Sequence, residues 1–236
     1  MSEIRVTSVV GENGGDRVGL TTGLTVGPLT GTTGIGATIS HQGHAQFAGV
    51  CTATSFVGSG TNLTGISQDF VNLGTTTISS AQSQVDIDFD VATYKNFKLY
   101  LEGWNPSTDC NMYCRFKISG SISSASNYSS LTIKKYGGGF DSNEYGGTNQ
   151  NYGYMSHNIG GNETYESYSA QLEIMTGSGT GMSFMHLATF YKDNGGQYVH
   201  NMGIVGWQNF NQIQGIRIYP STGNITAGKY TLYGIK

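Results

Sequence analysis

The sequence predicts an all-β protein in two parts: a Gly/Thr-rich, trimerising N-terminal shaft or anchor, and an antiparallel, jelly-roll-like β-sandwich head. Apolar residues nowhere hold the three-to-four spacing of an amphipathic helix for more than a turn or two, whereas two-residue alternation is frequent. Val18–Gln68 contains no Asp, Glu, Lys or Arg, and only two aromatic residues precede Ser67. These contrasts predict two domains, 1–66 and 67–236.

Residues 1–66 are rich in glycine and threonine and contain brief β-branched pieces at Ile4–Val10 and Ala37–Ser40. With Phe47 and Phe56 as its only aromatics, the region has too little apolar area to offset a backbone ordering cost of about 1–2 kcal/mol per residue. Isolated strands would also expose both edges, which closed assembly removes. We therefore expect this region to be covered by copies of itself, as a homotrimer.

The head is predicted to contain eight or so short strands. In Val85–Asp90 the apolar residues alternate with three aspartates, which gives one dry and one wet face. The expected strands are Val85–Asp90, Phe97–Leu101, Met112–Ile118, Tyr168–Ile174, Met182–Phe190, Tyr198–Ile204, Ile213–Tyr219 and Tyr230–Ile235. Short strands joined by Gly, Asn and Ser turns favour an antiparallel sandwich of the jelly-roll type.

Between Ser119 and Gly161 the alternation is lost in Gly, Ser, Asn and Tyr, so we expect long surface loops. Loops on a rigid scaffold often carry binding side chains, and tyrosine presents a flat, semi-polar face that suits sugars and protein surfaces. The predicted ligand-binding residues are Tyr136, Tyr145, Tyr152, Tyr154 and Trp207. Trp207 has polar neighbours in the sequence, which would suit the tip of a loop. The alternative is that Trp104 and Trp207 fill the core of the sandwich.

Composition excludes several classes of function. The net charge is −3 and 11% of residues are charged, so no basic stripe favours nucleic acid. No segment approaches the roughly 18–20 apolar residues of a membrane-spanning helix, and Met1–Val10 is a charged, alternating strand rather than a signal peptide.

An extended strand would separate Cys110 and Cys114 by about 13 Å, too far for a disulfide, so we expect free, buried thiols.

No motif predicts an enzyme, a cofactor or a metal site. Gly58–Gly60 and Gly177–Gly181 lack the strand and helix of a phosphate loop and are expected to form turns. His41 and His44, with Cys51 nearby, have metal-like spacing but suit a solvated turn. The aspartates of Val85–Asp90 should share one solvated face, and no catalytic triad can be assigned from the spacing of the other acidic residues.

Three segments carry a resemblance to a known family. Val50–Ile66 contains the run Thr-Ala-Thr-Ser-Phe, then Gly-Ser-Gly and Leu-Thr-Gly. This run resembles a repeat of virion structural and fibre proteins of tailed phages, particularly phages of cyanobacteria. The opening Ser2–Thr7 resembles the first strand of such proteins, and Ile225–Lys236, with its Leu-Tyr-Gly-Ile, resembles their common ending. The family's usual Pro-rich run is replaced here by Arg17–Val26.

The resemblance implies a non-enzymatic virion protein that is assembled in the host cytoplasm. It would be a homotrimeric, fibre-type appendage that attaches to other virion proteins through its N-terminal region and contacts host-surface glycan through its head. The alternative in the same class is a capsid decoration or cement protein that clamps capsomers with its N-terminal arm. A sugar-cleaving tail spike and a cellular sugar-binding module are the alternatives from other classes.

Overall fold

The structure is a computed structural model that describes residues 24–26, 37–39, 44–47, 50, 52, 70–136, 139–161, 163, 165–177 and 181–236. Contacts between Cα positions divide the chain into two units, Met1–Thr64 and Gly65–Lys236. In the first unit, β1 (Leu24–Val26), β2 (Ala37–Ile39) and β3 (Ala45–Phe47) form an antiparallel sheet in that order. The β piece predicted at Ala37–Ser40 is thus confirmed over Ala37–Ile39, whereas Ser40 and Ile4–Val10 lie outside the described residues.

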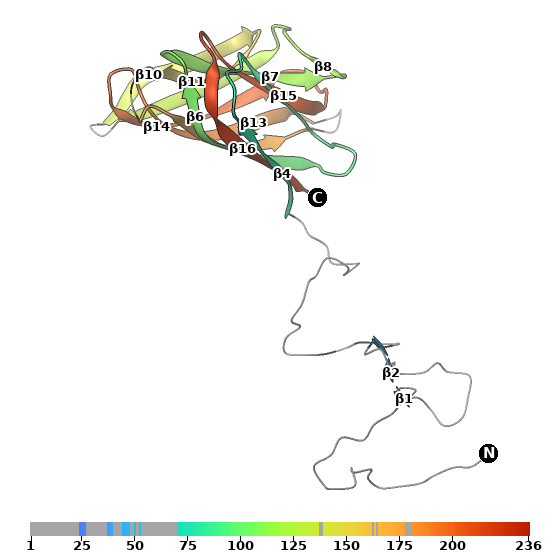
Figure 1. The fold of residues 1–236 in the computed structure, drawn as a ribbon. Coiled ribbons are helices and arrows are strands. Elements are labelled where there is room, and N and C mark those ends of the chain that lie inside the picture. Colours follow the sequence, from blue (N-terminus) through green and yellow to red (C-terminus); the bar gives the residue numbers. More distant parts are fainter. Residues whose placement is uncertain are drawn as a thin grey trace, which may run out of the picture. The chain divides into compact units, whose positions relative to one another are not determined.

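The second unit is a β-sandwich of two antiparallel sheets (Figure 1). The larger sheet has the strand order β10-β9-β14-β13-β12-β6-β16-β4. Its strands are β4 (Phe70–Ile78), β6 (Asn96–Pro106), β9 (Tyr128–Tyr136), β10 (Gly139–Gln150), β12 (Tyr168–Met175), β13 (Ser183–Lys192), β14 (Tyr198–Trp207) and β16 (Ile225–Ile235). The described residues contain no helix, so the all-β prediction is confirmed.

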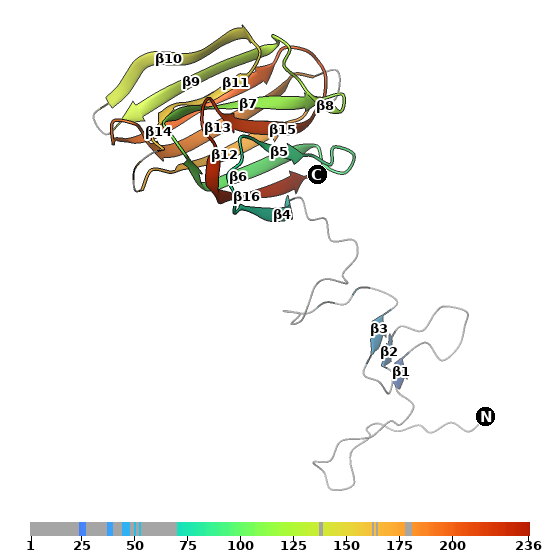
Figure 2. The ribbon, with the colours of Figure 1, turned by 45° about the horizontal axis from the view of Figure 1, so that its top comes forward.

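The smaller sheet lies against one face of the larger one (Figure 2). Its strands follow the order β11-β7-β15-β5, and the short β8 pairs with β7. They are β5 (Val85–Asp88), β7 (Cys110–Ile118), β8 (Ser121–Ile122), β11 (Gly153–Ile159) and β15 (Ile213–Pro220). Strand β11 is an edge strand that also contacts β9, β13 and β14 of the larger sheet, and so ties the two layers together.

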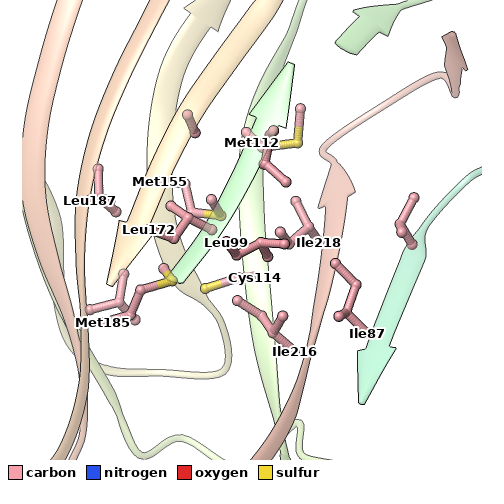
Figure 3. Packing of buried hydrophobic residues seen from close by; sticks show 14 of the residues in the cluster. Ile87, Leu99, Met112, Cys114, Met155, Leu172, Met185, Leu187, Ile216 and Ile218 are labelled. Atoms are coloured by element: carbon pink, nitrogen blue, oxygen red, sulfur yellow. The ribbon is translucent and has the colours of Figure 1, made fainter. Parts of the chain in front are cut away.

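The core is the apolar layer between the sheets (Figure 3). Alternation decides which side chains enter it: Met112 and Cys114 of β7 point inward, as do Leu172 of β12 and Met185 of β13, and all four are fully buried. A buried side chain of this size contributes about 1.5–3 kcal/mol relative to exposure. Cys110 and Cys114 are buried, free thiols, as predicted; Cys51 lies outside the described residues.

The prediction of long surface loops over Ser119–Gly161 was wrong, because this segment supplies strands β8 to β11. After Tyr128, the buried positions of β9 are polar, Ser130, Thr132 and Lys134, while Leu131 and Ile133 are exposed. Ser130 Oγ accepts a hydrogen bond from the Tyr154 amide (3.2 Å), which satisfies a polar group inside the sandwich. The inward side chains therefore do not form the apolar series by which a strand is recognised in a sequence.

Candidate ligand-binding surface

An aromatic strip crosses the outer face of the smaller sheet and reaches Tyr145 on β10, the edge strand of the larger sheet. Strand pairing sets Tyr219 of β15 beside Tyr113 of β7, and Tyr113 beside Tyr154 of β11. Tyr113 occupies an outward position because its neighbours Met112 and Cys114 fill the core. The aromatic strip comprises Tyr113, Tyr145, Tyr152, Tyr154, His157 and Tyr219.

Tyr113 is the centre of the strip. Its ring centroid lies 4.3 Å from that of Tyr152, 5.4 Å from that of Tyr154 and 5.8 Å from that of Tyr219. The strip continues from Tyr154 to Tyr145, whose centroids are 6.2 Å apart. These separations are those of interacting aromatic pairs, so the rings support one another as a continuous surface.

Exposure differs along the strip. Tyr154 is 9% exposed and forms its base, whereas Tyr113, Tyr152 and Tyr219 are partly exposed. Burial raises the pKa of the Tyr152, Tyr154 and Tyr219 phenols above the ordinary value of 10.0. At neutral pH these hydroxyls are protonated, so each can donate and accept a hydrogen bond.

At each end of the strip, a cationic side chain forms a cation–π contact with a tyrosine ring. The Arg115 guanidinium lies 5.4 Å from the Tyr219 ring centroid, and Arg115 Nε donates a hydrogen bond to the Asn151 carbonyl (3.0 Å). At the other end, Lys134 Nζ lies 5.8 Å from the Tyr145 ring centroid and 5.1 Å from that of Tyr136. Lys134 is only 1% exposed, so it supports these rings from inside the sandwich and does not meet solvent.

A small polar hollow adjoins the strip. It has a volume of about 180 Å³ and is lined by Asp109, Cys110, Asn111, Asn158, Asn194 and Ser221. Asn111 connects the two features: its Nδ2 donates to the Tyr113 hydroxyl (3.2 Å), and its Oδ1 accepts from the Asn158 amide (2.9 Å). Carboxylate, amide and hydroxyl groups thus gather at one side of the aromatic strip, in which the Tyr113 ring is tilted by 32° against that of Tyr152 and by 66° against that of Tyr219.

Three of the five residues predicted to bind ligand, Tyr145, Tyr152 and Tyr154, lie together in the strip. Tyr136, at the end of β9, is partly buried against the core and contacts Lys134. The placement of Trp207 on a loop tip was wrong. It is 2% exposed, because it occupies an inward position of β14, and its ring packs against that of Tyr128 (4.9 Å).

Sequence reasoning missed Tyr113, Tyr219 and Asn111. Tyr113 could have been recognised as a candidate binding residue, because it is a large aromatic side chain on the solvent-facing side of a strand whose other side is apolar. The alternation in Met112–Ile118 showed that position as outward, but only the strand order brings Tyr219 and Tyr154 to either side of it. Register between strands distant in sequence cannot be read from any one of them.

Two aspartates of the smaller sheet form ion pairs. Asp86 and Asp88 are exposed, as is Asp90, which confirms their predicted solvated face. Asp86 is bound by Arg217 and Asp88 by Lys117, each at 2.7 Å. Within the described residues no three His, Cys, Asp or Glu side chains group as a metal site; His44 is exposed and His41 lies outside that part of the chain.

The chain matches no known protein-family model, and a search of curated proteins finds no match either. In the part of the chain that the structure describes, no helix is long and apolar enough to span a membrane.

Proposed function

We propose that this protein is a non-enzymatic structural protein of a tailed-phage virion, a trimeric fibre-type appendage whose head binds host-surface glycan through the aromatic strip. The phrases in Val50–Ile66 and Ile225–Lys236 support the virion assignment. Residues 1–66 would form the trimerising shaft or anchor that joins other virion proteins, and the sandwich would be of the jelly-roll type.

The single observation that carries glycan binding is the environment of Tyr113. Its ring is flanked by Tyr152 and Tyr219, and its hydroxyl is hydrogen-bonded to Asn111 at the edge of the polar hollow. A pyranose ring has an apolar C–H face and a rim of hydroxyl groups. The first would lie on the tyrosine rings, and the second would exchange hydrogen bonds with the amides and carboxylate of the hollow.

A shallow surface of this kind binds one sugar weakly. Three heads on one trimer can exceed the affinity of a single site by about 10²–10⁴ when all three engage a repetitive glycan. Weak single sites also allow release and renewed contact, which suits a protein that searches a cell surface. No bond in the ligand needs to be cleaved for this function.

The test is binding of the full-length protein to host-envelope polysaccharide, measured by biolayer interferometry for the wild type, Tyr113→Ala and Tyr152→Ala. Removal of one ring should cost about 1.4 kcal/mol of binding free energy per site, which corresponds to a tenfold loss of single-site affinity. The matched control is Tyr233→Ala, because Tyr233 belongs to a separate aromatic pair with Phe70 (4.6 Å) on the larger sheet. Equal binding by all four proteins would contradict the assignment of the strip.

Two further measurements bear on the class of protein. Cryo-electron microscopy of the particle should place copies at the tail or baseplate; copies between capsomers would instead make this a decoration protein that works through residues 1–66. A glycan-release assay on host envelope should show no turnover, and release abolished by substitution of an Asp or Glu residue would overturn the non-enzymatic assignment.

A further inference from the structure

A second surface lies on the opposite side of the sandwich, on the outer face of the larger sheet. It is a hollow of about 630 Å³ lined by Leu131, Ile133, Lys135, His186, His200, Met202, Gly203 and Ile204. We call its four large apolar side chains the β9–β14 patch: Leu131, Ile133, Met202 and Ile204. They are 41%, 42%, 50% and 40% exposed.

Strand register makes the β9–β14 patch continuous. Leu131 pairs with Ile204 across β9 and β14, and Ile133 pairs with Met202, so the four side chains form a block. Strand β9 directs Leu131 and Ile133 outward while it buries Ser130 and Thr132. A sheet with one solvated face has the reverse arrangement, so β9 has the pattern of a strand covered on its outer side.

Beyond the patch the same face is mixed: it carries ion pairs, and also the exposed, stacked rings of Phe190 and Tyr198, whose centroids lie 5.9 Å apart. Along one lateral row, Ile204 is followed by His186, then Glu173, then Lys98 on successive strands. Lys98 and Glu173 form an ion pair at 2.7 Å, and Lys229 and Glu102 form another at 2.9 Å. Along this row the side chains change from apolar on β14 to ion-paired on β12, so the β9–β14 patch ends at β13 in this direction.

The size of the patch indicates its occupant. Four half-exposed aliphatic side chains offer a few hundred Å², which is well below the ~800 Å² per partner of a stable complex between free proteins. A partner held nearby by another contact needs far less, because tethering gives an effective concentration in the millimolar range. A second copy of this chain, joined through residues 1–66, meets that condition.

We propose that the β9–β14 patch of one head packs against the head of a second copy in the assembled protein. This inference rests on the trimer in the proposed function, and it is compatible with glycan binding because the strip and the patch lie on the outer faces of opposite sheets. The patch would face the inside of the assembly and the strip its outside.

The chain contains an internal control for the test. Met202, in the patch, is 50% exposed in the single chain, and Met182, outside it, is 67% exposed. Dilute peroxide oxidises exposed methionines to the sulfoxide, and peptide mass spectrometry measures each rate in the intact full-length protein. If the patch is covered, Met202 will be oxidised about fivefold or more slowly than Met182, and both will react alike in denaturant.

A lysine at the neighbouring outward position, Ile133→Lys, should uncover the patch and raise the Met202 rate to that of Met182. The control Gln171→Lys adds the same charge at an exposed position of β12, in the ion-paired part of the face, and should leave Met202 protected. Both substitutions are at exposed positions, so the fold tolerates them.

Light scattering on the same samples separates the two proposals. A trimer with protected Met202 supports both the assembly and the patch contact. A trimer in which Met202 reacts as fast as Met182 overturns the patch contact alone. A monomer overturns the trimer, and with it this contact, even if Met202 is protected, because a segment of the same chain would then be the cover.

Discussion

Tyr145 stacks on His157 with ring centroids 4.3 Å apart and an interplanar angle of 21°. Tyr145 belongs to β10, the edge of the larger sheet, and His157 to β11, the edge of the smaller one. The stack therefore closes the sandwich along this side, and it carries the aromatic strip from one sheet to the other. The integrity of the strip and the stability of the fold are linked at this contact.

Replacing Tyr145 by alanine should lower the free energy of unfolding. The aromatic contacts with Tyr154 and His157 are lost, at about 0.5–1.5 kcal/mol each beyond the area buried. Urea denaturation followed by tryptophan fluorescence measures the change. Tyr145→Phe keeps the ring and should therefore be more stable than Tyr145→Ala; an equally unstable Phe variant would show that the hydroxyl, not the stack, matters.

Gly153→Ala should destabilise the sandwich by about 1–3 kcal/mol through overpacking. A Cβ at Gly153 would collide with the Val205 side chain and lie 2.7 Å from Cys114 Sγ, because β11 passes close to β14 here. A thermal melt measures the loss, and Val205→Ala in the same chain should restore part of it. Gly181→Ala, where a Cβ has open space, is the matched control and should be nearly neutral.

Tyr128→Phe should cost about 1–3 kcal/mol, because it leaves buried polar groups without partners. The Tyr128 hydroxyl accepts a hydrogen bond from the Phe116 amide (2.8 Å) and donates one to the Ser123 carbonyl (2.9 Å), and the side chain is fully buried. Equilibrium unfolding in urea is the measurement. The same change at Tyr198, which is 63% exposed, should have little effect; a similar loss at both positions would refute the argument.

The ion pair of Asp86 and Arg217 should make the free energy of unfolding depend on pH in the acidic range. Arg217 Nε and Nη2 each donate to an Asp86 oxygen at 2.7 Å, and these hydrogen bonds hold the Asp86 pKa below its ordinary 3.8. A carboxylate with a lowered folded-state pKa stabilises the fold above 3.8, and this contribution is lost as the pH falls through the folded value.

Asp86→Asn should therefore reduce the unfolding free energy at neutral pH by about 0.2–1 kcal/mol, the range of solvent-exposed pairs. In strong acid the variant and the wild type should become equally stable, as denaturant titrations at both pH values would show. A difference that persists unchanged in acid would mean that packing, rather than charge, accounts for the effect.

The two described thiols should be unreactive in the folded protein. Burial raises the pKa of Cys110 to about 12, and it also raises that of Cys114, so neither forms thiolate at neutral pH. Titration with an aromatic disulfide reagent should label neither residue before denaturation and both after it, with peptide mapping to assign the label. Rapid labelling of Cys114 in native protein would show that β7 opens easily.

Several elements could be predicted because each has one apolar and one wet face. Strands β5, β6 and β7 follow the alternation of Val85–Asp90, Phe97–Leu101 and Met112–Ile118. Strands β9 to β11 could not, since glycine, serine, asparagine and tyrosine occupy positions where an apolar series was sought. Their inward polar groups are satisfied by partners from other strands, and such partners are not visible in a local sequence pattern.

The density of tyrosines between Ser119 and Gly161 indicated part of the candidate site, and Tyr145, Tyr152 and Tyr154 do lie together. The same reasoning failed for Trp207, because polar neighbours in the sequence do not show on which side of a strand a ring lies. For Tyr113 the alternation showed that the side chain faces outward, but it did not show which residues of the neighbouring strands lie beside it.

The sequence by itself determined the all-β class, the outward and inward faces of the regularly alternating strands, and the burial of Cys110 and Cys114. These properties depend on residue spacing along one strand, which the chain fixes locally. Only the tertiary structure decided that Tyr219, Tyr113 and Tyr154 stand side by side, and that Leu131, Ile133, Met202 and Ile204 form one patch. Both surfaces arise from register between strands far apart in sequence, and that register is set by the packing of the whole sandwich.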